Sequence, residues 1–306
     1  MSVFCKWIFL LRKLFFLLLL RVRIVFCYKS RIAICCIAKY ENLYIREWVE
    51  YHKSIGVDRI YIYDNNEPDG ERLEDVIGDY IKDQFCIIVD FRGKVASQLD
   101  AYSDMYQKYG TYYDWIAFID CDEFLTIGDN YTPKNLKSVL NSSVYQNFHM
   151  IHINWMCYGD CGALDYEDGN IQERFPEPIK PLDFCSYYDF PENNHVKTIM
   201  RGNLSNVNFV SPHFMIVPYC RCCNAKGENI QMDSAFTQFD FSNIYIRHYQ
   251  TKTIGEWVKI KMKRGYADQP YEDAIKKLQL GSFFAKNIRT HEKVEFAERL
   301  IKMMQK

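Results

Sequence analysis

The chain has 306 residues, of which 48% are hydrophobic, 16% aromatic and 25% charged. This composition is typical of a packed globular protein and excludes a disordered chain, a collagen and a polytopic membrane protein. The length suits one α/β domain with extensions better than two independent catalytic domains. A formal net charge of -1 disfavours a general nucleic-acid binder, which needs a broad basic surface.

Residues 1–30 form a basic, apolar leader. Residues 1–31 hold seven cations and no acid, which leaves a net charge of -8 on the rest of the chain. The longest uninterrupted apolar run, 14–20, is shorter than the roughly 20 residues that a membrane-spanning helix requires. We expect a helix that lies in the membrane interface against anionic lipid, at the cytoplasmic face of the cell membrane. A single uncleaved anchor and a helix packed on protein are the alternatives.

Strands and helices alternate after the leader. Apolar runs of strand length, and apolar residues at helical spacing between them, predict strands at 31–37, 59–63, 85–89 and 115–119, and helices at 45–55, 73–81 and 96–109. This alternation predicts an α/β fold with a mostly parallel central sheet, whose ligands bind beyond the carboxyl ends of the strands.

The second half of the chain is less regular. Thr132 and Pro133 predict the N-cap and first turn of a helix that ends at Leu140. Residues 156–195 have no clear period, and we expect them to form the acceptor-side wall of a site, because so long a loop is usually functional. The remaining predicted elements are a half-buried strand at 151–155, strands at 196–200 and 244–248, a helix from the Thr253–Glu256 capping box to about Lys263, and a helical tail over 271–306. One domain over 31–270 is therefore expected between the leader and the tail.

The strongest chemical signal lies in 115–124, where an apolar strand is followed by Asp120 and Asp122. Strand side chains alternate with period two, so both carboxylates are expected on one side at the edge of the sheet. Such a pair suits a hard divalent cation, which can bridge the two phosphates of a nucleotide diphosphate. An acidic surface loop is the alternative, because Asp-x-Asp sequences are common.

Several motifs together resemble glycosyltransferase family 92 and the related family-2-like bacterial enzymes. They are the run 34–41; Glu47, Trp48, Tyr51, His52, Gly56 and Val57; 63–65; 120–124; Trp155, Tyr158 and Gly159; 173–175; 195–199; and His248, Tyr249, Lys252, Lys259, Arg264 and Gly265. The resemblance implies a glycosyltransferase A-type (Rossmann-like) fold, a nucleotide-sugar donor such as a uridine diphosphate sugar, Mn²⁺ or Mg²⁺, and inversion at the anomeric carbon. Tyr40 departs from the family, which usually has asparagine there.

The resemblance also implies roles for individual residues. Asp64 would contact the nucleoside, Asp120 the ribose or the metal, and Asp122 and His248 the metal. The implied substrate-binding set is Lys39, Glu41, Asp64, Asn66, Gln98, Asp120, Lys197, Lys252 and Arg264.

The setting of His248 supports its role independently of the resemblance. It ends a predicted strand, and imidazole binds ions such as manganese. A buried histidine bonded to backbone is the alternative. Cations in the capped helix could neutralise a departing diphosphate, although Lys261 and Lys263 read equally well as a solvated helix face.

Inverting transfer needs a general base that deprotonates the acceptor hydroxyl. Asp160, which follows the strand ending near Trp155, is the first candidate and Glu173 the second. Both lie in the irregular segment, where a carboxylate can equally belong to a turn.

The leading hypothesis is a metal-dependent inverting glycosyltransferase that acts at the membrane surface on a glycan or lipid-linked acceptor. A nucleotidyl- or phosphotransferase could use the same acid pair, although a Gly-rich lysine loop is absent from the sequence. A catalytically silent, membrane-attached protein that binds nucleotide sugars is the third possibility, and Tyr40 is the motif-level hint for it.

Overall fold

The computed structural model describes residues 30–132, 134–179, 191–272 and 279–305. The chain divides into two compact units, Met1–Ser30 and Arg31–Lys306. The expected leader helix lies, apart from Ser30, outside the described residues, and so does Pro133. Within the described ranges, no helix combines the length and apolar character that crossing a membrane requires.

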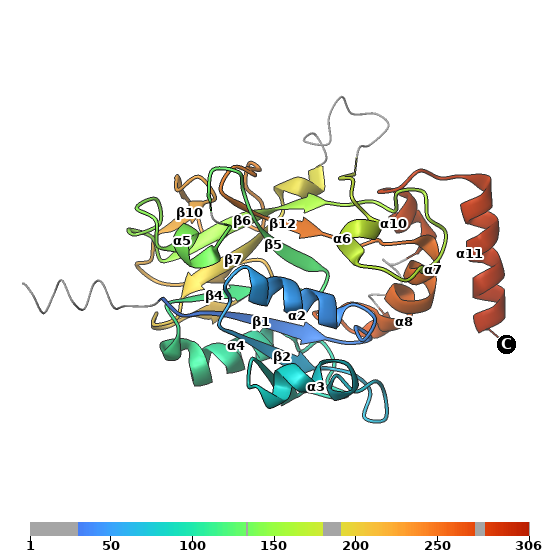
Figure 1. Ribbon diagram of the computed structural model, residues 1–306, viewed down its shortest axis with the longest axis horizontal. Coiled ribbons are helices and arrows are strands. Elements are labelled where there is room, and N and C mark those ends of the chain that lie inside the picture. Colours follow the sequence, from blue (N-terminus) through green and yellow to red (C-terminus); the bar gives the residue numbers. More distant parts are fainter. Residues whose placement is uncertain (1–29, 133, 180–190, 273–278, 306) are drawn as a thin grey trace, which may run out of the picture. The chain divides into compact units, whose positions relative to one another are not determined.

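The second unit is built around a sheet that has ten strands in its described part (Figure 1). Their spatial order is β11-β10-β6-β7-β4-β1-β2-β3, and β12 joins β6 to β5. The strands are β1 (Ile32–Ala38), β2 (Arg59–Asp64), β3 (Cys86–Asp90), β4 (Trp115–Phe118), β5 (Glu123–Ile127), β6 (Met150–Cys157), β7 (Val196–Arg201), β10 (Cys222–Asn224), β11 (Asn229–Ile230) and β12 (Ile244–His248). A separate hairpin pairs β8 (Asn208–Phe209) with β9 (Met215–Ile216).

The first half of the sheet is parallel. β1 pairs in parallel with β2 and β4, and β2 pairs in parallel with β3. All seven residues of β1 are buried, as expected for a central strand with both faces covered. One face packs against α2 (Ile45–Ser54) and α3 (Glu74–Lys82), and the other packs against α4 (Gln98–Tyr109). The predicted α/β fold with a mostly parallel central sheet is confirmed.

The second half of the sheet is mixed. β7 runs antiparallel to both β4 and β6, and β12 lies parallel to β6 and antiparallel to β5. All eight residues of β6 are buried, so the prediction of a half-buried strand is wrong. The polar residues that suggested exposure are buried: the Asn154 amide donates to the carbonyl oxygens of Asn193 and Thr237, and burial lowers the pKa of His152 to about 4, so its imidazole is neutral.

Two local predictions also need correction. Helix α5 (Leu136–Leu140) begins later than the sequence suggests, because its N-cap is Asn135 rather than Thr132. The Asn135 side chain accepts from the backbone N–H groups of Lys137 and Ser138 at 3.0 and 3.4 Å. Strand β5 was not predicted, because its partner β12 lies more than a hundred residues further along the chain.

The C-terminal helices pack on the domain. They are α7 (Ile254–Glu256), the π-helical turn η4 (Trp257–Lys261), α8 (Met262–Arg264), α10 (Leu280–Phe284) and α11 (His291–Met304). The predicted capping box between Thr253 and Glu256 is present. Trp257, Phe283 and Ala297 share one buried apolar cluster, so the tail belongs to the same compact unit as the sheet.

Candidate active site

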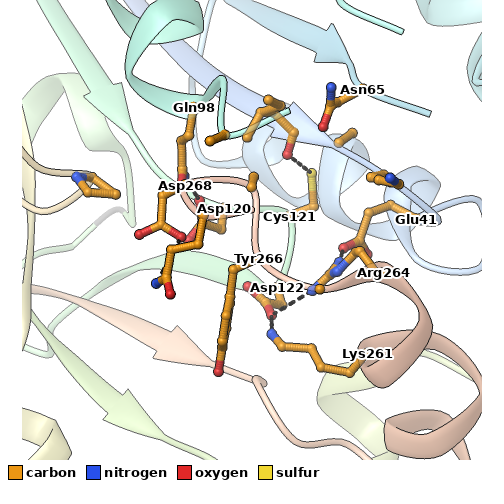
Figure 2. Close-up of a pocket in the computed structure, with 18 of the residues that line it drawn as sticks. Glu41, Asn65, Gln98, Asp120, Cys121, Asp122, Lys261, Arg264, Tyr266 and Asp268 are labelled. Carbon is orange, nitrogen blue, oxygen red and sulfur yellow. Dashed lines mark hydrogen bonds and ion pairs between the residues drawn. The ribbon is translucent and has the colours of Figure 1, made fainter. Parts of the chain in front are cut away.

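A pocket of about 290 Å³ opens at the carboxyl ends of β1 and β4 (Figure 2). Segments from both halves of the sheet line it. Predicted site residues in its wall are Lys39, Glu41, Gln98, Asp120, Asp122, Lys197, His248 and Arg264. The edge of the sheet at which parallel strands end is where α/β domains generally bind ligands.

Asp122 is a buried acid of the pocket, with a side chain that is 4% exposed. One carboxylate oxygen lies 3.6 Å from His248 Nε2, and the other lies 3.3 Å from Lys261 Nζ and 4.0 Å from the Arg264 guanidinium. Burial by itself raises the pKa of Asp122, but Lys261, His248 and Lys252 outweigh it and hold the pKa well below the ordinary value. Asp122 is therefore an ionised carboxylate at neutral pH.

Asp120 has a separate set of partners. One oxygen pairs with Lys197 Nζ at 2.8 Å and the other accepts from the Gln98 amide at 2.7 Å. Lys197 also lies 3.6 Å from Glu123, and burial together with the neighbouring Asp120 and Asp122 raises the pKa of Glu123 well above the ordinary value. Lys197 thus holds Asp120 in place and shields it from Glu123.

The two aspartates line one pocket, but they do not lie on one strand. The chain leaves β4 at Phe118 and turns into β5 at Glu123, whose N–H donates to the carbonyl of Asp120 at 3.1 Å. The predicted period-two alternation through Asp120 and Asp122 is therefore wrong, and the turn gives each carboxylate its own partners.

The helix after Thr253 supplies the cations that face Asp122 (Figure 2). The Lys261 side chain is only 13% exposed, so the reading of Lys261 as part of a solvated face is wrong, whereas Lys263 is exposed. Lys261 is the last residue of the π-helical turn η4, and such turns are frequent at functional sites. Lys259 points elsewhere and pairs with Asp165.

Arg264 joins the helix to the loop after β1. It forms a close ion pair with Glu41, and burial lowers the pKa of Arg264 to about 10. Gly265 then ends the helix at φ 75°, ψ -156°, a conformation open to glycine almost alone. In the loop after β1, Tyr40 adopts φ 56°, in which asparagine is tolerated best. The departure at Tyr40 therefore concerns backbone strain, and it removes no charged group.

Some predicted ligand-binding residues support the pocket wall from behind. Asp64 is buried and pairs with Arg92 at 2.6 Å, while its other oxygen accepts from the backbone and amide of Asn66. Asn65, between them, lines the pocket, whereas Asp64 and Asn66 do not. Lys252 is also outside the lining; its ammonium lies over the Tyr44 ring, 4.4 Å from the centroid. Direct ligand contacts by these three residues are therefore not supported: Asp64 and Asn66 hold the loop after β2 together, and Lys252 stabilises the ionised form of Asp122.

Neither predicted base lies in the pocket. Asp160 is buried against the C-terminal tail, where it pairs with Lys293 at 2.5 Å and its backbone N–H donates to Asn287 at 2.9 Å. Glu173 is exposed on α6 (Ile171–Arg174). The carboxylates of Asp160 and Glu173 therefore have no access to a reaction in the pocket, and the sequence-based assignments of both as the base are corrected.

The structure adds residues that the sequence analysis did not select. His213, Tyr266 and Asp268 line the pocket together with Lys261. Tyr266 and Asp268 follow Gly265, and that glycine at the end of a basic helix was the signal that could have marked them. His213 lies in the hairpin between β8 and β9, whose two-residue strands carry no detectable period.

Asp122 and His248 are the residues of the pocket best suited to a divalent ion. Burial lowers the pKa of His248 even though Asp122 raises it, so the imidazole is neutral and can donate a lone pair. An ionised carboxylate and a neutral imidazole fit Mn²⁺, with substrate oxygens and water completing the shell. In the described ranges no group of three or more acidic, histidine or cysteine side chains forms a complete site. Asp120 lines the same pocket, with one oxygen on Lys197 and the other on Gln98, and its assignment as a further metal ligand stays a prediction.

A parallel sheet with acidic and basic groups at its carboxyl edge is typical of α/β domains that bind nucleotides. The particular family follows from the sequence: the model of glycosyltransferase family 92 matches residues 30–288, so the chain belongs to this family.

Two plant relatives illustrate the similarity. A family 92 protein of Oryza sativa subsp. japonica is 31% identical over 103 residues, which are 34% of this chain and 17% of the relative. One of Ricinus communis is 28% identical over 125 residues, 41% of this chain and 22% of the relative. The chain thus matches about a fifth of the length of these relatives.

Solved structures are more distant. S. aureus TarS has a TM-score of 0.38 and 11% identity, over 84% of this chain and 43% of that chain. The mannosyltransferase PcManGT from Pyrobaculum calidifontis, in complex with GDP-Man and Mn²⁺, has a TM-score of 0.31 and 10% identity, over 42% of this chain and 36% of that chain.

Proposed function

We propose that this protein is a glycosyltransferase that moves a sugar from a nucleoside diphosphate sugar, with uridine diphosphate as the carrier, to a hydroxyl group of a glycan or lipid-linked acceptor, with inversion. Family membership supports the reaction class. The observation that carries the proposal is the buried, ionised Asp122, which faces His248 on one side and Lys261 and Arg264 on the other within one pocket.

The residues divide the work as follows. Asn65 and Gln98 lie toward the first strands, the side on which a nucleoside binds in Rossmann-like domains. Lys261 and Arg264 are placed to receive the negative charge that develops on the departing diphosphate. Because both cations are enclosed, their attraction for that charge is stronger than it would be in water.

Asp122 and His248 would hold Mn²⁺ or Mg²⁺ when it is bound, and the ion would supply further charge stabilisation to the diphosphate. The protein's own contribution is to keep the carboxylate ionised and the imidazole neutral. Lys261 and Lys252, with His248 itself, do the first, and burial does the second.

The direct test is turnover by the full chain. Purified protein is incubated with a panel of nucleotide sugars, with and without Mn²⁺, and released nucleoside diphosphate is measured together with the donor-induced thermal shift. A donor at a hundred times its dissociation constant stabilises by about 2.7 kcal/mol. We expect Asp122→Asn to lose the metal-dependent shift and turnover. Asp129→Asn, which changes a fully exposed acid, is the matched control, and we expect it to keep the metal-dependent thermal shift and the turnover.

Three results would contradict the proposal. Release of pyrophosphate would identify a nucleotidyltransferase, and tight donor binding without hydrolysis or transfer would identify a silent binding protein. Equal activity of the Asp122→Asn variant and the wild type would remove the acid from the mechanism.

We further propose that the protein works at the cytoplasmic membrane surface. The seven cations and apolar residues of the leader support this proposal. Co-flotation of the full chain with vesicles containing anionic lipid, and not with neutral vesicles, is the expected result. Equal flotation with both, or with neither, would contradict it.

A further inference from the structure

His213 is held in the pocket wall by three local bonds. Its Nδ1 lies 2.9 Å from the carbonyl oxygen of Val196, its own carbonyl accepts from the Thr198 hydroxyl at 2.8 Å, and its N–H donates to Ser211 at 3.2 Å. A carbonyl can only accept, so Nδ1 carries the proton and Nε2 carries the lone pair. In the part of the chain that the structure describes, no hydrogen-bond partner is assigned to Nε2.

The surroundings of His213 are rings. The Trp155 ring lies edge-on to His213 at 5.3 Å and within 4.2 Å of His248, so it connects His213 to the side of the pocket that holds Asp122. His195 stacks on Trp155 at 4.8 Å, and Phe236, 56% exposed, lies 4.4 Å from His195. This row of rings leads from the surface to the pocket. Flat ring faces with a few polar tips suit the C–H faces and hydroxyl groups of a saccharide.

The other possible bases of the pocket are less suitable. Glu41, Asp120 and Asp122 are each paired with a cation, so proton uptake by any of them would break an ion pair, whereas the Nε2 lone pair of His213 has no assigned partner in the described part of the chain. Asp268 is exposed and accepts from Gln269 at 3.5 Å. Burial, with a contribution from Lys197, lowers the pKa of His213 to about 4, so its imidazole is neutral at physiological pH. The negative charge of an arriving diphosphate would raise its proton affinity.

We propose, on the basis of the transferase function above, that His213 is the catalytic base and that the acceptor is a saccharide bound along Trp155. The acceptor oxygen forms a bond to the anomeric carbon while the bond from that carbon to the diphosphate oxygen breaks. The electron pair of the broken bond leaves with the nucleoside diphosphate, and the hydroxyl proton passes to His213 Nε2.

The test separates this role from a structural one. In His213→Asn the amide nitrogen can still donate to the Val196 carbonyl, but the group at the Nε2 position is gone. His291→Asn, at an exposed histidine of α11, is the matched control. Wild type and variants are assayed for transfer from the donor found above to a panel of nitrophenyl glycosides, with donor binding followed by thermal shift.

We expect kcat for transfer to fall by about 10²–10⁴-fold in His213→Asn, the typical contribution of a general base, while donor binding and the unfolding temperature stay unchanged. If His213→Asn does not fold, His213→Gln is used, since it keeps an acceptor near the Nε2 position that cannot take up the proton.

The proposal would be overturned if the folded His213→Asn variant transferred the sugar at the wild-type rate. It would also be overturned if Asp268→Asn lost transfer while His213→Asn kept it. Transfer to none of the glycosides by an enzyme that hydrolyses its donor would overturn the saccharide acceptor. Failure to turn over any nucleotide sugar would instead refute the transferase function itself.

Discussion

Replacing Glu256 by glutamine tests how the helix that carries Lys261 and Arg264 is anchored. Glu256 is 3% exposed and receives the Arg174 guanidinium at 3.2 and 2.8 Å, the Tyr44 hydroxyl at 2.5 Å and the Thr253 hydroxyl at 2.7 Å. Burial by itself raises the pKa of this carboxyl, but the bonds from Arg174, Tyr44 and Thr253 outweigh it and hold the pKa below the ordinary value.

The expected loss of folding free energy follows from the Arg174 guanidinium, which loses its charged partner. Arg174 is 10% exposed, and removing one member of a buried ion pair typically costs about 3–5 kcal/mol. For a domain of this size, about 3 kcal/mol lowers the unfolding temperature by roughly 6–12 °C. Equilibrium urea unfolding followed by circular dichroism measures the free energy directly. Asp79→Asn, which removes an exposed partner of Arg46, is the control, and we expect no measurable change.

The pH dependence provides a second measurement. Since the pKa of Glu256 is lower in the folded than in the unfolded protein, its contribution to stability is complete above the unfolded pKa of about 4.3 and is lost as the pH falls through the folded pKa. The difference between wild type and Glu256→Gln should therefore shrink below about pH 4.3. Anchoring of the helix by Glu256 would be refuted if Glu256→Gln lowered the free energy of unfolding no more than Asp79→Asn does. It would also be refuted if the stability difference between wild type and Glu256→Gln grew as the pH fell.

Three further changes have defined outcomes. Lys261→Met should weaken donor binding about tenfold, the usual effect of losing a charged contact. Lys263→Met, at an exposed position, should leave donor affinity unchanged. Isothermal titration measures both affinities, and equal values would contradict the placement of Lys261 in the pocket. Asp160→Asn should lower the free energy of unfolding by about 3 kcal/mol while the folded variant keeps wild-type transfer, and selective loss of transfer would reinstate it as the base. Lys197→Met should lower the free energy of unfolding in urea by about 3 kcal/mol, because Asp120 loses its buried cation. An unchanged unfolding midpoint would show that the Lys197–Asp120 pair does not stabilise the fold.

Much of the first half of the fold could be predicted from local patterns. The continuous apolar run of β1 and the helical spacing of Ile45, Trp48, Val49 and His52 depend only on neighbours in the chain, and both elements are found near their predicted bounds. Strand β5 could not be found in this way. Its apolar residues are explained by pairing with β12 and by packing on α2, and such long-range contacts leave no local period.

The sequence by itself determined the fold class, the family and the residue types of the site: an acid pair after β4, a histidine at the end of β12, and a basic capped helix. Only the tertiary structure decided what each side chain does. Asp120 and Asp122 acquire different partners because the chain turns between them. Asp160 pairs with Lys293, and Lys261, the last residue of the π-helical turn, pairs with Asp122. The physical reason is that the ionisation and access of a charged group depend on burial and on partners brought from distant segments, and residue spacing does not report them.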